Sequence, residues 1–543
     1  MNNMNLKQSV LLASLGVTLG LQGCAGPFSD DPHLGMNVPR EKLRVIEPMQ
    51  LEPAADQSDT ADTAVPEPPA EMQLTLEDCR VMVMANNLDL RAELLGPTIA
   101  QQSITEEQAR FEALFFANAS LNKTDTPTAT TLSGSQTESS GSDFGVDMPL
   151  RTGGNLRVDL PSNRFKTDNQ FSTLNPAYTA DFAVSLSQNL LRNAGTKVNS
   201  HGIRIAHYQS QAAEARAKLE VIRVVALADR VYWRLYAARQ ELEVRKQQHE
   251  LATTQLERAK RLLESGANAE IEVTRAEAGV AEGLEAIIVA ENNLRDQERE
   301  LKRILNKPGL TMLSPTVMIP ATPPDPVRYE LDPGTLVDAS MDGRMELLEL
   351  ELQLAQDAST VDYQRNQTLP LAVLDYTYTS NGLGTSYGSA FQQVEDRDFE
   401  DQRVSVRIEV PLGNEAAKSR LRRAILTRLQ RSATRELRRA QIEQEVLNAV
   451  DQLEANWQRI LANRQRAILA GRTLAAEQRQ FDLGLNTSTD VLDAQARLAD
   501  AQSAEARSLA DYQISQIDLA YATGTVLGAA NIHWEPSEPE LND

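Results

Sequence analysis

The sequence contains few of the residues on which many protein functions depend. Its 543 residues include two cysteines and five histidines, and aromatic residues make up 5 % of the chain. Two cysteines cannot form a disulfide framework or a multi-cysteine metal site, and Cys79 is expected to be a small, buried apolar residue. Basic residues are also outnumbered, since 54 lysines and arginines stand against 76 aspartates and glutamates, for a formal net charge of −22. This balance excludes a nucleic-acid-binding protein, because neutralising phosphates needs a basic surface.

Signatures of catalysis are absent as well. The chain has no P-loop and no dinucleotide-binding fingerprint. None of the histidines has a carboxylate or a cysteine at a recurring ligand spacing. The sequence therefore predicts neither an enzyme nor a bound metal or cofactor. What it contains instead is a set of long tracts rich in Leu, Ala, Gln, Glu and Arg, which are typical of long helices.

The N-terminal residues predict export. Lys7 precedes a short apolar stretch that ends at Leu21 and is too short to span a bilayer, so residues 1–23 are interpreted as a signal peptide. The tetrad LQGC resembles a bacterial lipobox, in which the cysteine, here Cys24, is lipidated, and the alanine after it favours sorting to an outer membrane. A plain secretory signal with an incidental cysteine is the alternative. Residues 24–72, rich in Pro, Asp and Glu, predict an extended tether.

The main signal beyond the tether is an internal repeat. RLLESGANAEIEVTRAEAGVAE begins at Arg261 and RQFDLGLNTSTDVLDAQARLAD begins at Arg479, an offset of 218 residues that also superposes Gly266 on Gly484. Chance similarity between two helices of like composition does not predict a glycine break at the same distance from both helix starts. We therefore predict two copies of one unit, at residues 73–306 and 334–530, joined by a proline-rich linker at 307–333 and followed by an acidic tail at 531–543.

Each copy is predicted to contain a long helix, a tight break and a returning helix. Residues 201–264 and 416–483 lack proline and carry apolar residues at three- and four-residue spacing. At 1.5 Å per residue such a helix is on the order of 100 Å long, which no single globular core accommodates. The helices must therefore pack along each other as a coiled-coil-like tube or rod, with the glycine breaks at hairpin tips. Ser488 or Thr489 is the expected N-cap of the second returning helix.

Segments with the opposite periodicity lie between the helices. Alternation predicts strands around Phe115 and Phe182 that pair with each other, and strands around Tyr376 and Val406 that pair across a loop rich in Gly, Ser and Asn. Such alternation is typical both of a soluble sheet on a core and of a barrel with lipid outside and water inside. The export signal and the lack of a covering amphipathic partner favour the barrel. Since small barrels need about eight strands, the chain is predicted to oligomerise.

A third hairpin is predicted only in the first copy. Alternating apolar residues run from Phe144 to Leu150 and from Leu156 to Leu160, on either side of a turn at Gly153. The sequence leaves two interpretations open, since this hairpin either enlarges the barrel or stands outside it as an extracellular flap. The chain therefore contributes four to six strands.

Two motifs and the doubled helix–strand–strand–helix unit resemble the TolC-like outer-membrane efflux protein family. The motifs are F-x-x-G-x-x-x-x-x-D-V-L-x-A-Q from Phe481 to Gln495 and a strand that ends V-P-L-G at Gly413, and the resemblance covers about residues 74–530. It implies an α+β membrane protein in which three chains form a transmembrane β-barrel continuous with a long periplasmic α-helical tunnel. With Cys24, this indicates a lipoprotein-type member, anchored in the outer membrane and extending into the periplasm.

The same resemblance implies the function and the partners. A homotrimer would be the exit duct of a tripartite efflux or type I secretion system, and would passively conduct substrate from an inner-membrane transporter and a periplasmic adaptor to the exterior. The partners would also include outer-membrane lipid. The exported substrate is not implied. A lipid-anchored helical rod without a channel is the alternative, which explains the helices and the tether but not the amphipathic strands at equivalent points of both copies.

The family closes its periplasmic end with acidic rings, and Asp490 and Asp493 match the two family aspartates that line the aperture. Their i, i+3 spacing puts both on one face of the returning helix. Three copies would give two stacked anionic rings that concentrate cations. The alternative is a first-turn acid that interacts with the helix dipole, with Asp493 simply solvated.

Other tip residues are assigned by the same resemblance. Phe481 stands where the family often has tyrosine, Asn486 where it has arginine, and Glu272 is the matching acid of the first copy. Because an Asn cannot make an ion pair with Glu272, a lock of the closed state is expected to be weaker or differently made. Small and apolar residues match the adaptor-docking motif, although they also suit any tight helical hairpin: Ser265, Gly266, Ala267, Leu483, Gly484 and Leu485.

The remaining segments are expected to surround the tunnel. The proline-rich linker, a helix at 75–95 and a short helix at 346–364 are predicted to form a belt around its middle, the equatorial region.

Overall fold

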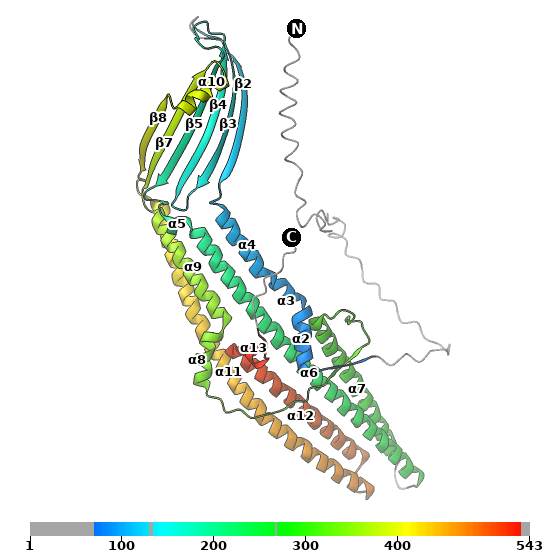
Figure 1. Cartoon of the computed structure of the whole chain (residues 1–543). Coiled ribbons are helices and arrows are strands. Elements are labelled where there is room, and N and C mark those ends of the chain that lie inside the picture. The colour runs from blue at the N-terminus through cyan, green and yellow to red at the C-terminus, as the bar shows by residue number, and fades with distance from the viewer. Residues whose placement is uncertain (1–69, 130–133, 267–268, 534–543) are drawn as a thin grey trace, which may run out of the picture. The chain divides into compact units, whose positions relative to one another are not determined.

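The computed structural model describes residues 70–129, 134–266 and 269–533 (Figure 1). The predicted signal peptide, the lipidation site at Cys24 and most of the tether and the acidic tail lie outside the described residues. The described chain combines long helices with a six-stranded antiparallel sheet and a small parallel pair, β1 (Glu71–Leu74) with β6 (Val317–Pro320). The predicted mixture of helices and strands is therefore confirmed. Within these three ranges, no helix is long and apolar enough to cross a bilayer.

Four long helices form the two predicted hairpins. Helix α6 (His201–Glu264) is followed by α7 (Glu270–Leu305), and α11 (Glu415–Asp482) by α12 (Ser488–Thr523). The spacing of apolar residues explains the packing, because the stripe on α6 that contains Val221 is fully buried. Helix α12 packs along both α11 and α6, so the two hairpins share one bundle.

The helix predicted at residues 75–95 is wrong in its bounds. The chain forms α2 (Leu76–Asn86), α3 (Leu88–Glu93) and α4 (Leu95–Ala109) instead. The first break lies at Asn87, whose backbone is extended and whose side chain accepts a hydrogen bond from the N–H of Leu90 at 2.9 Å. Its amide also donates to the carbonyl of Ile304 at 3.0 Å. Asn87 therefore caps α3 and ties it to the end of α7, a long-range contact that spacing cannot predict.

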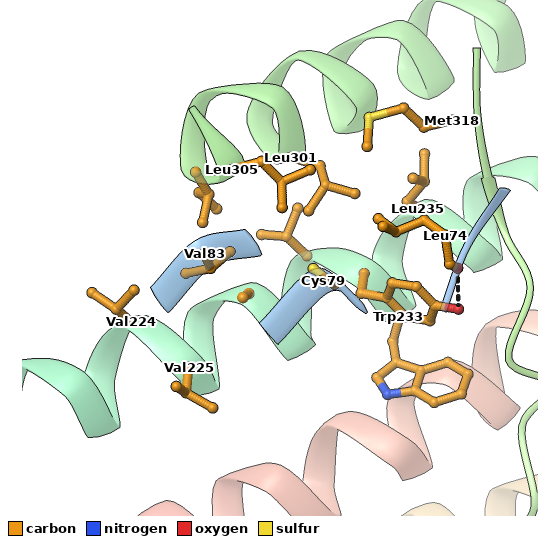
Figure 2. Packing of buried hydrophobic residues seen from close by; sticks show 14 of the residues in the cluster. Leu74, Cys79, Val83, Val224, Val225, Trp233, Leu235, Leu301, Leu305 and Met318 are labelled. Carbon is orange, nitrogen blue, oxygen red and sulfur yellow. Dashed lines mark hydrogen bonds between the residues drawn. The ribbon is translucent and has the colours of Figure 1, made fainter. Parts of the chain in front are cut away.

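The core lies where α2 packs between α6 and α7 (Figure 2). The Tyr232 hydroxyl donates to the carbonyl of Leu74 at 3.0 Å and accepts from the N–H of Thr322 at 2.9 Å. Cys79 is completely buried here, as expected, and burial raises the pKa of its thiol to about 12. The neighbouring Arg80 pairs with buried Asp229 on α6 at 2.7 Å. Removing one partner of such a buried pair costs about 3–5 kcal/mol, so the pair fixes how α2 sits on α6.

The six-stranded sheet has the order β2-β3-β4-β5-β7-β8. The predicted third hairpin is confirmed as a pair of strands joined by a turn in which Gly153 has a φ of +89°. The direct pairing predicted between the strands around Phe115 and Phe182 is wrong, because this hairpin lies between them. The strands are β2 (Leu114–Asp125), β3 (Gln136–Pro149), β4 (Gly154–Thr167), β5 (Ala177–Asn189), β7 (Leu371–Gly384) and β8 (Glu400–Glu409).

The segment between β7 and β8 also differs from its prediction as a loop. It contains helix α10 (Tyr387–Asp396), which starts with a capping box between Ser386 and Ser389 and packs on β7. At Gly382 a Cβ atom would lie 2.0 Å from the carbonyl oxygen of Ala390. The glycines of the expected loop therefore allow a close helix–strand approach.

The connections of the sheet to the helices all lie at one end of its strands, because neighbouring strands alternate in direction. Helix α4 leads into β2, β5 leads through α5 (Thr196–Asn199) into α6, α9 (Met345–Gln367) leads into β7, and β8 leads into α11 (Figure 1). Helix α9 confirms the short helix predicted at 346–364. Two further short helices complete the described elements: α8 (Pro333–Gly343) and α13 (Val526–Ala529).

Candidate functional site

The site is built on the two hairpin tips, where the chain turns back on itself. Gly266 and Gly484 both have a φ of +71°, a left-handed conformation that glycine adopts without strain. After α11, the N–H of Gly484 donates to the carbonyl of Phe481 at 3.0 Å and that of Leu485 to Gln480 at 2.9 Å. These bonds satisfy the free carbonyls of the last helical turn. The prediction that both glycines end long helices is confirmed.

Helix α12 begins with a capping box around Asp490. The carboxylate of Asp490 accepts from the N–H of Thr487 at 2.9 Å and from its hydroxyl at 2.7 Å. The predicted cap at Ser488 or Thr489 is wrong, because Thr487 is the N-cap and Ser488 is buried. The hydrogen bonds from Thr487 lower the pKa of Asp490, whose side chain is otherwise exposed. Asp490 therefore stabilises the start of α12 within a single chain. This agrees with the alternative prediction, in which Asp490 is an acid of the first helical turn and not part of a ring.

Asp493 lies one turn further along α12. It is exposed, and it is three residues from Asp490, which places the two carboxylates on neighbouring positions of one helix face. A single chain leaves both carboxylates accessible to solvent. Their assignment to an acidic ring stays a prediction.

Glu272 joins the two hairpins. Its side chain, which is 10 % exposed, accepts a hydrogen bond from the backbone N–H of Ser488 at 2.7 Å and from Arg275 at 2.6 Å. A carboxylate on the first turn of α7 therefore caps the positive end of α12. Asn486 makes no contribution to this link, since its amide contacts Glu477 on α11 instead.

A second link connects the long helices near the same tips. Arg258 on α6 forms an ion pair with Asp482, the last residue of α11, and its guanidinium lies 6.0 Å from the ring centroid of Phe481. Phe481 is 4 % exposed and packs against Val491 of α12. The aromatic residue of the tip motif is thus part of an apolar core. Sequence reasoning missed this pair, because Arg258 lies outside the motif and Asp482 stands at one of its unspecified positions.

Further ion pairs follow the seam between α6 and α12. Arg230 pairs with Asp518 at 2.7 Å, and Arg245 with Asp500 at 2.9 Å. A third pair joins Glu241 and Arg507. The two hairpins are therefore held side by side by charge as well as by apolar packing.

The predicted docking residues lie at the ends of the hairpins. Leu483 and Leu485 are 73 % and 71 % exposed. Ser265 and Gly266 at the other tip are exposed too, while Ala267 lies outside the described residues. Across the part of the chain that the structure describes, no group of three or more His, Cys, Asp or Glu residues could hold a metal ion.

The chain combines two long helical hairpins with an amphipathic antiparallel sheet. Comparison with known proteins finds the same combination in outer-membrane proteins. Residues 336–525 match the family model described as outer membrane efflux protein. The chain is 24 % identical to outer membrane protein TolC of Vibrio cholerae over 55 % of this chain and 66 % of that protein. It is 25 % identical to TolC of Escherichia coli over 44 % of this chain and 48 % of that protein. The chain thus matches about half to two thirds of the length of these relatives.

Solved structures share the fold. The outer-membrane channel OprN gives a TM-score of 0.61 at 16 % identity, covering 83 % of this chain and 90 % of OprN. The CmeC outer membrane channel of Campylobacter jejuni gives 0.63 at 14 % identity, covering 83 % of this chain and 85 % of CmeC. The family match over residues 336–525, the two TolC relatives and the shared fold therefore support the resemblance to TolC-like outer-membrane factors that the tip motif and the doubled unit predicted. OprN and CmeC are described as outer-membrane channels, and TolC as an outer membrane protein.

Proposed function

We propose that this protein is the outer-membrane exit duct of a tripartite efflux or type I secretion system, and that it passively conducts substrate to the exterior. The observation that carries the proposal is the union of a two-faced sheet with two long helical hairpins in one chain. A sheet of this kind suits the outer membrane, and hairpins of this length suit a passage across the periplasm. The names of the relatives support the same assignment.

The two faces of the sheet support a transmembrane barrel. One face carries Phe144, Val158 and Val184, while the opposite face carries Asp143 and Arg157. Among the described strands, β2 and β8 each have one neighbour, so each leaves one edge of backbone groups without a partner. In lipid an unpaired backbone group costs several kcal/mol, and only a closed barrel avoids such edges. Closure by three copies of the chain, a homotrimer, satisfies both edges.

The helices supply the periplasmic part of the duct. All four connections from the sheet leave at one end, so the hairpins continue from the barrel toward the periplasm. Their similar lengths and matching glycine turns support two repeats, residues 73–306 and 334–530, with the linker at 307–333 in an equatorial belt. Lipidation at Cys24, after cleavage of a signal peptide, would anchor each chain to the outer membrane.

The hairpin tips form the gate and the docking surface of this duct. Asp490 and Asp493 from three copies make two acidic rings at the aperture, which favour cations. The Glu272 and Arg258 links hold the hairpins together in the closed state. The exposed leucines at positions 483 and 485, with Ser265, Gly266, Ala267 and Gly484, meet a periplasmic adaptor that connects the duct to an inner-membrane transporter.

Conductance separates the duct from the helical rod. Purified full-length protein is expected to form trimers that insert into planar lipid bilayers and give discrete, cation-selective single-channel currents, because the barrel lumen and the acidic rings are continuous. Heat is expected to convert the trimers to monomers on a denaturing gel. Well-folded, membrane-inserted trimers without conductance would favour the rod.

A further inference from the structure

The β3–β4 hairpin occupies the middle of the sheet rather than an edge. It pairs with β2 on one side and with β5 on the other. One row of paired residues shows this continuity, because Phe115 pairs with Val146, Val146 with Val158, and Val158 with Val184. All four side chains of this row are apolar and lie on one face of the sheet. The hairpin therefore fills the space between the two strands that the first copy of the repeat was predicted to pair directly.

The other face of the hairpin matches its neighbours equally well. Arg157 of β4 forms ion pairs with Asp159 at 3.2 Å and with Asp143 of β3 at 3.4 Å. Its guanidinium also lies 4.3 Å from the ring centroid of Phe116 on β2. The polar face is thus cross-linked from β2 to β4. A flap outside the sheet would lose this contact with β2 and expose both faces of the hairpin to one environment.

We propose, resting on the channel function above, that three copies of this chain close an eighteen-stranded barrel, with β8 of one copy paired to β2 of the next. Six strands that alternate in direction leave the two edges antiparallel, so each copy can extend the ladder of its neighbour.

The added hairpin sets the width of the exit. Barrel diameter grows roughly linearly with strand number, so eighteen strands give about 1.5 times the diameter of a barrel made from four strands per chain. Barrels of about 16 to 18 strands enclose an aqueous channel. The membrane section then passes bulky, hydrated polar substrates without dehydrating them. Selection by size and charge is left to the helical tips.

Paired cysteines test the position of the hairpin in the full-length trimer. We expect disulfides in Phe115→Cys/Val146→Cys and in Val158→Cys/Val184→Cys, because each pair lies on adjacent strands. No disulfide is expected in Phe115→Cys/Val184→Cys, whose residues are three strand spacings or about 14 Å apart, well beyond the reach of about 7 Å between Cα atoms. The single-cysteine variants are the matched controls. A 115–184 disulfide, or the failure of both adjacent pairs, overturns the proposal.

A second set of variants tests closure between copies. Ala117→Cys on β2 is combined in turn with cysteine at Gln402, Val404, Val406 and Ile408, which point to the same face of β8. One of these combinations is expected to give covalent trimers, and trimers that never cross-link would exclude the β8–β2 junction. Conductance of the same samples separates the two proposals. If the protein conducts ions but forms a 115–184 disulfide, the channel function stands and the eighteen-stranded barrel is wrong. If folded trimers in the membrane do not conduct, the channel function is wrong whatever the number of strands.

Discussion

Replacing Glu272 with alanine is expected to increase the open-to-closed ratio of the channel roughly 10- to 100-fold. This carboxylate caps α12 from α7, so opening of the tips must break its bond to the Ser488 N–H, while its bond to Arg275 lies within α7. Hydrogen bonds to charged groups contribute about 1.5–3 kcal/mol, and each 1.4 kcal/mol is about tenfold in an equilibrium constant. Single-channel open probability at fixed voltage measures the change.

Two further variants give this result its meaning. Glu270→Ala removes an exposed acid from the same first turn of α7 and should leave open probability unchanged. Glu272→Gln keeps an acceptor for the Ser488 N–H but loses the charge, so its effect should be intermediate. If Glu272→Ala lowers the thermal stability of the trimer and leaves gating unaltered, the link is structural and the lock lies elsewhere.

Removing both tip carboxylates is expected to abolish most of the cation selectivity of the duct. The variant of choice is Asp490→Asn/Asp493→Asn, because an asparagine at position 490 keeps an oxygen that can accept from the Thr487 N–H and so spares the helix cap. In three copies six negative charges disappear from the aperture, and the permeability ratio of K⁺ to Cl⁻ should fall toward that of the bulk ions. Reversal potentials in a salt gradient measure this ratio.

The single variants separate the two residues. Asp493→Asn alone should lower selectivity without affecting stability, since its carboxylate is exposed and lies outside the capping box. Asp490→Ala should also weaken the start of α12, because it removes the carboxylate that accepts from the Thr487 N–H in the capping box. If the double asparagine variant is as cation-selective as the natural protein, the two aspartates do not form the selectivity rings. The proposed channel function is not affected by that result.

The pH dependence of the cap follows from the direction of its pKa shift. Thr487 lowers the pKa of Asp490, so the stabilisation by the capping box is complete above the ordinary aspartate value of about 3.9. It is lost only as the pH falls through the lowered value.

Much of the helical architecture could be predicted because it is local. The apolar stripe of α6 and the absence of proline specify a long helix whatever the tertiary contacts of the segment. Helix α6 begins and ends at the predicted residues, His201 and Glu264. The start of α12 shows the limit of such reasoning. Thr487, Ser488 and Thr489 are all capable caps by type, and only the backbone conformation, extended at Thr487, decides among them.

Strand partners were less predictable. Alternation identifies strands and their faces, but it does not specify which strand lies beside which. The strands around Phe115 and Phe182 were expected to pair, and the β3–β4 hairpin between them has the same two-faced pattern, so either arrangement satisfies the alternation. Backbone pairing resolves this only in the folded sheet.

The tip site depends on contacts between distant parts of the chain. Glu272 and Ser488 are 216 residues apart, and their hydrogen bond forms because folding brings α7 against the start of α12. Family resemblance pointed to Glu272 as a tip residue, although its partner is a backbone N–H that no side-chain motif records. Arg258 and Asp482 give no signal in the sequence for the same reason.

The central claim is that this chain forms one continuous duct from three copies. Cryo-electron microscopy of the full-length protein in lipid nanodiscs tests it most directly. We predict a threefold particle in which six strands per chain close a barrel across the lipid disc, and in which the helical hairpins continue from it as a hollow tunnel that narrows at Asp490 and Asp493. A helical bundle that lies beside the disc, with sheets that do not close around a lumen, would contradict the account.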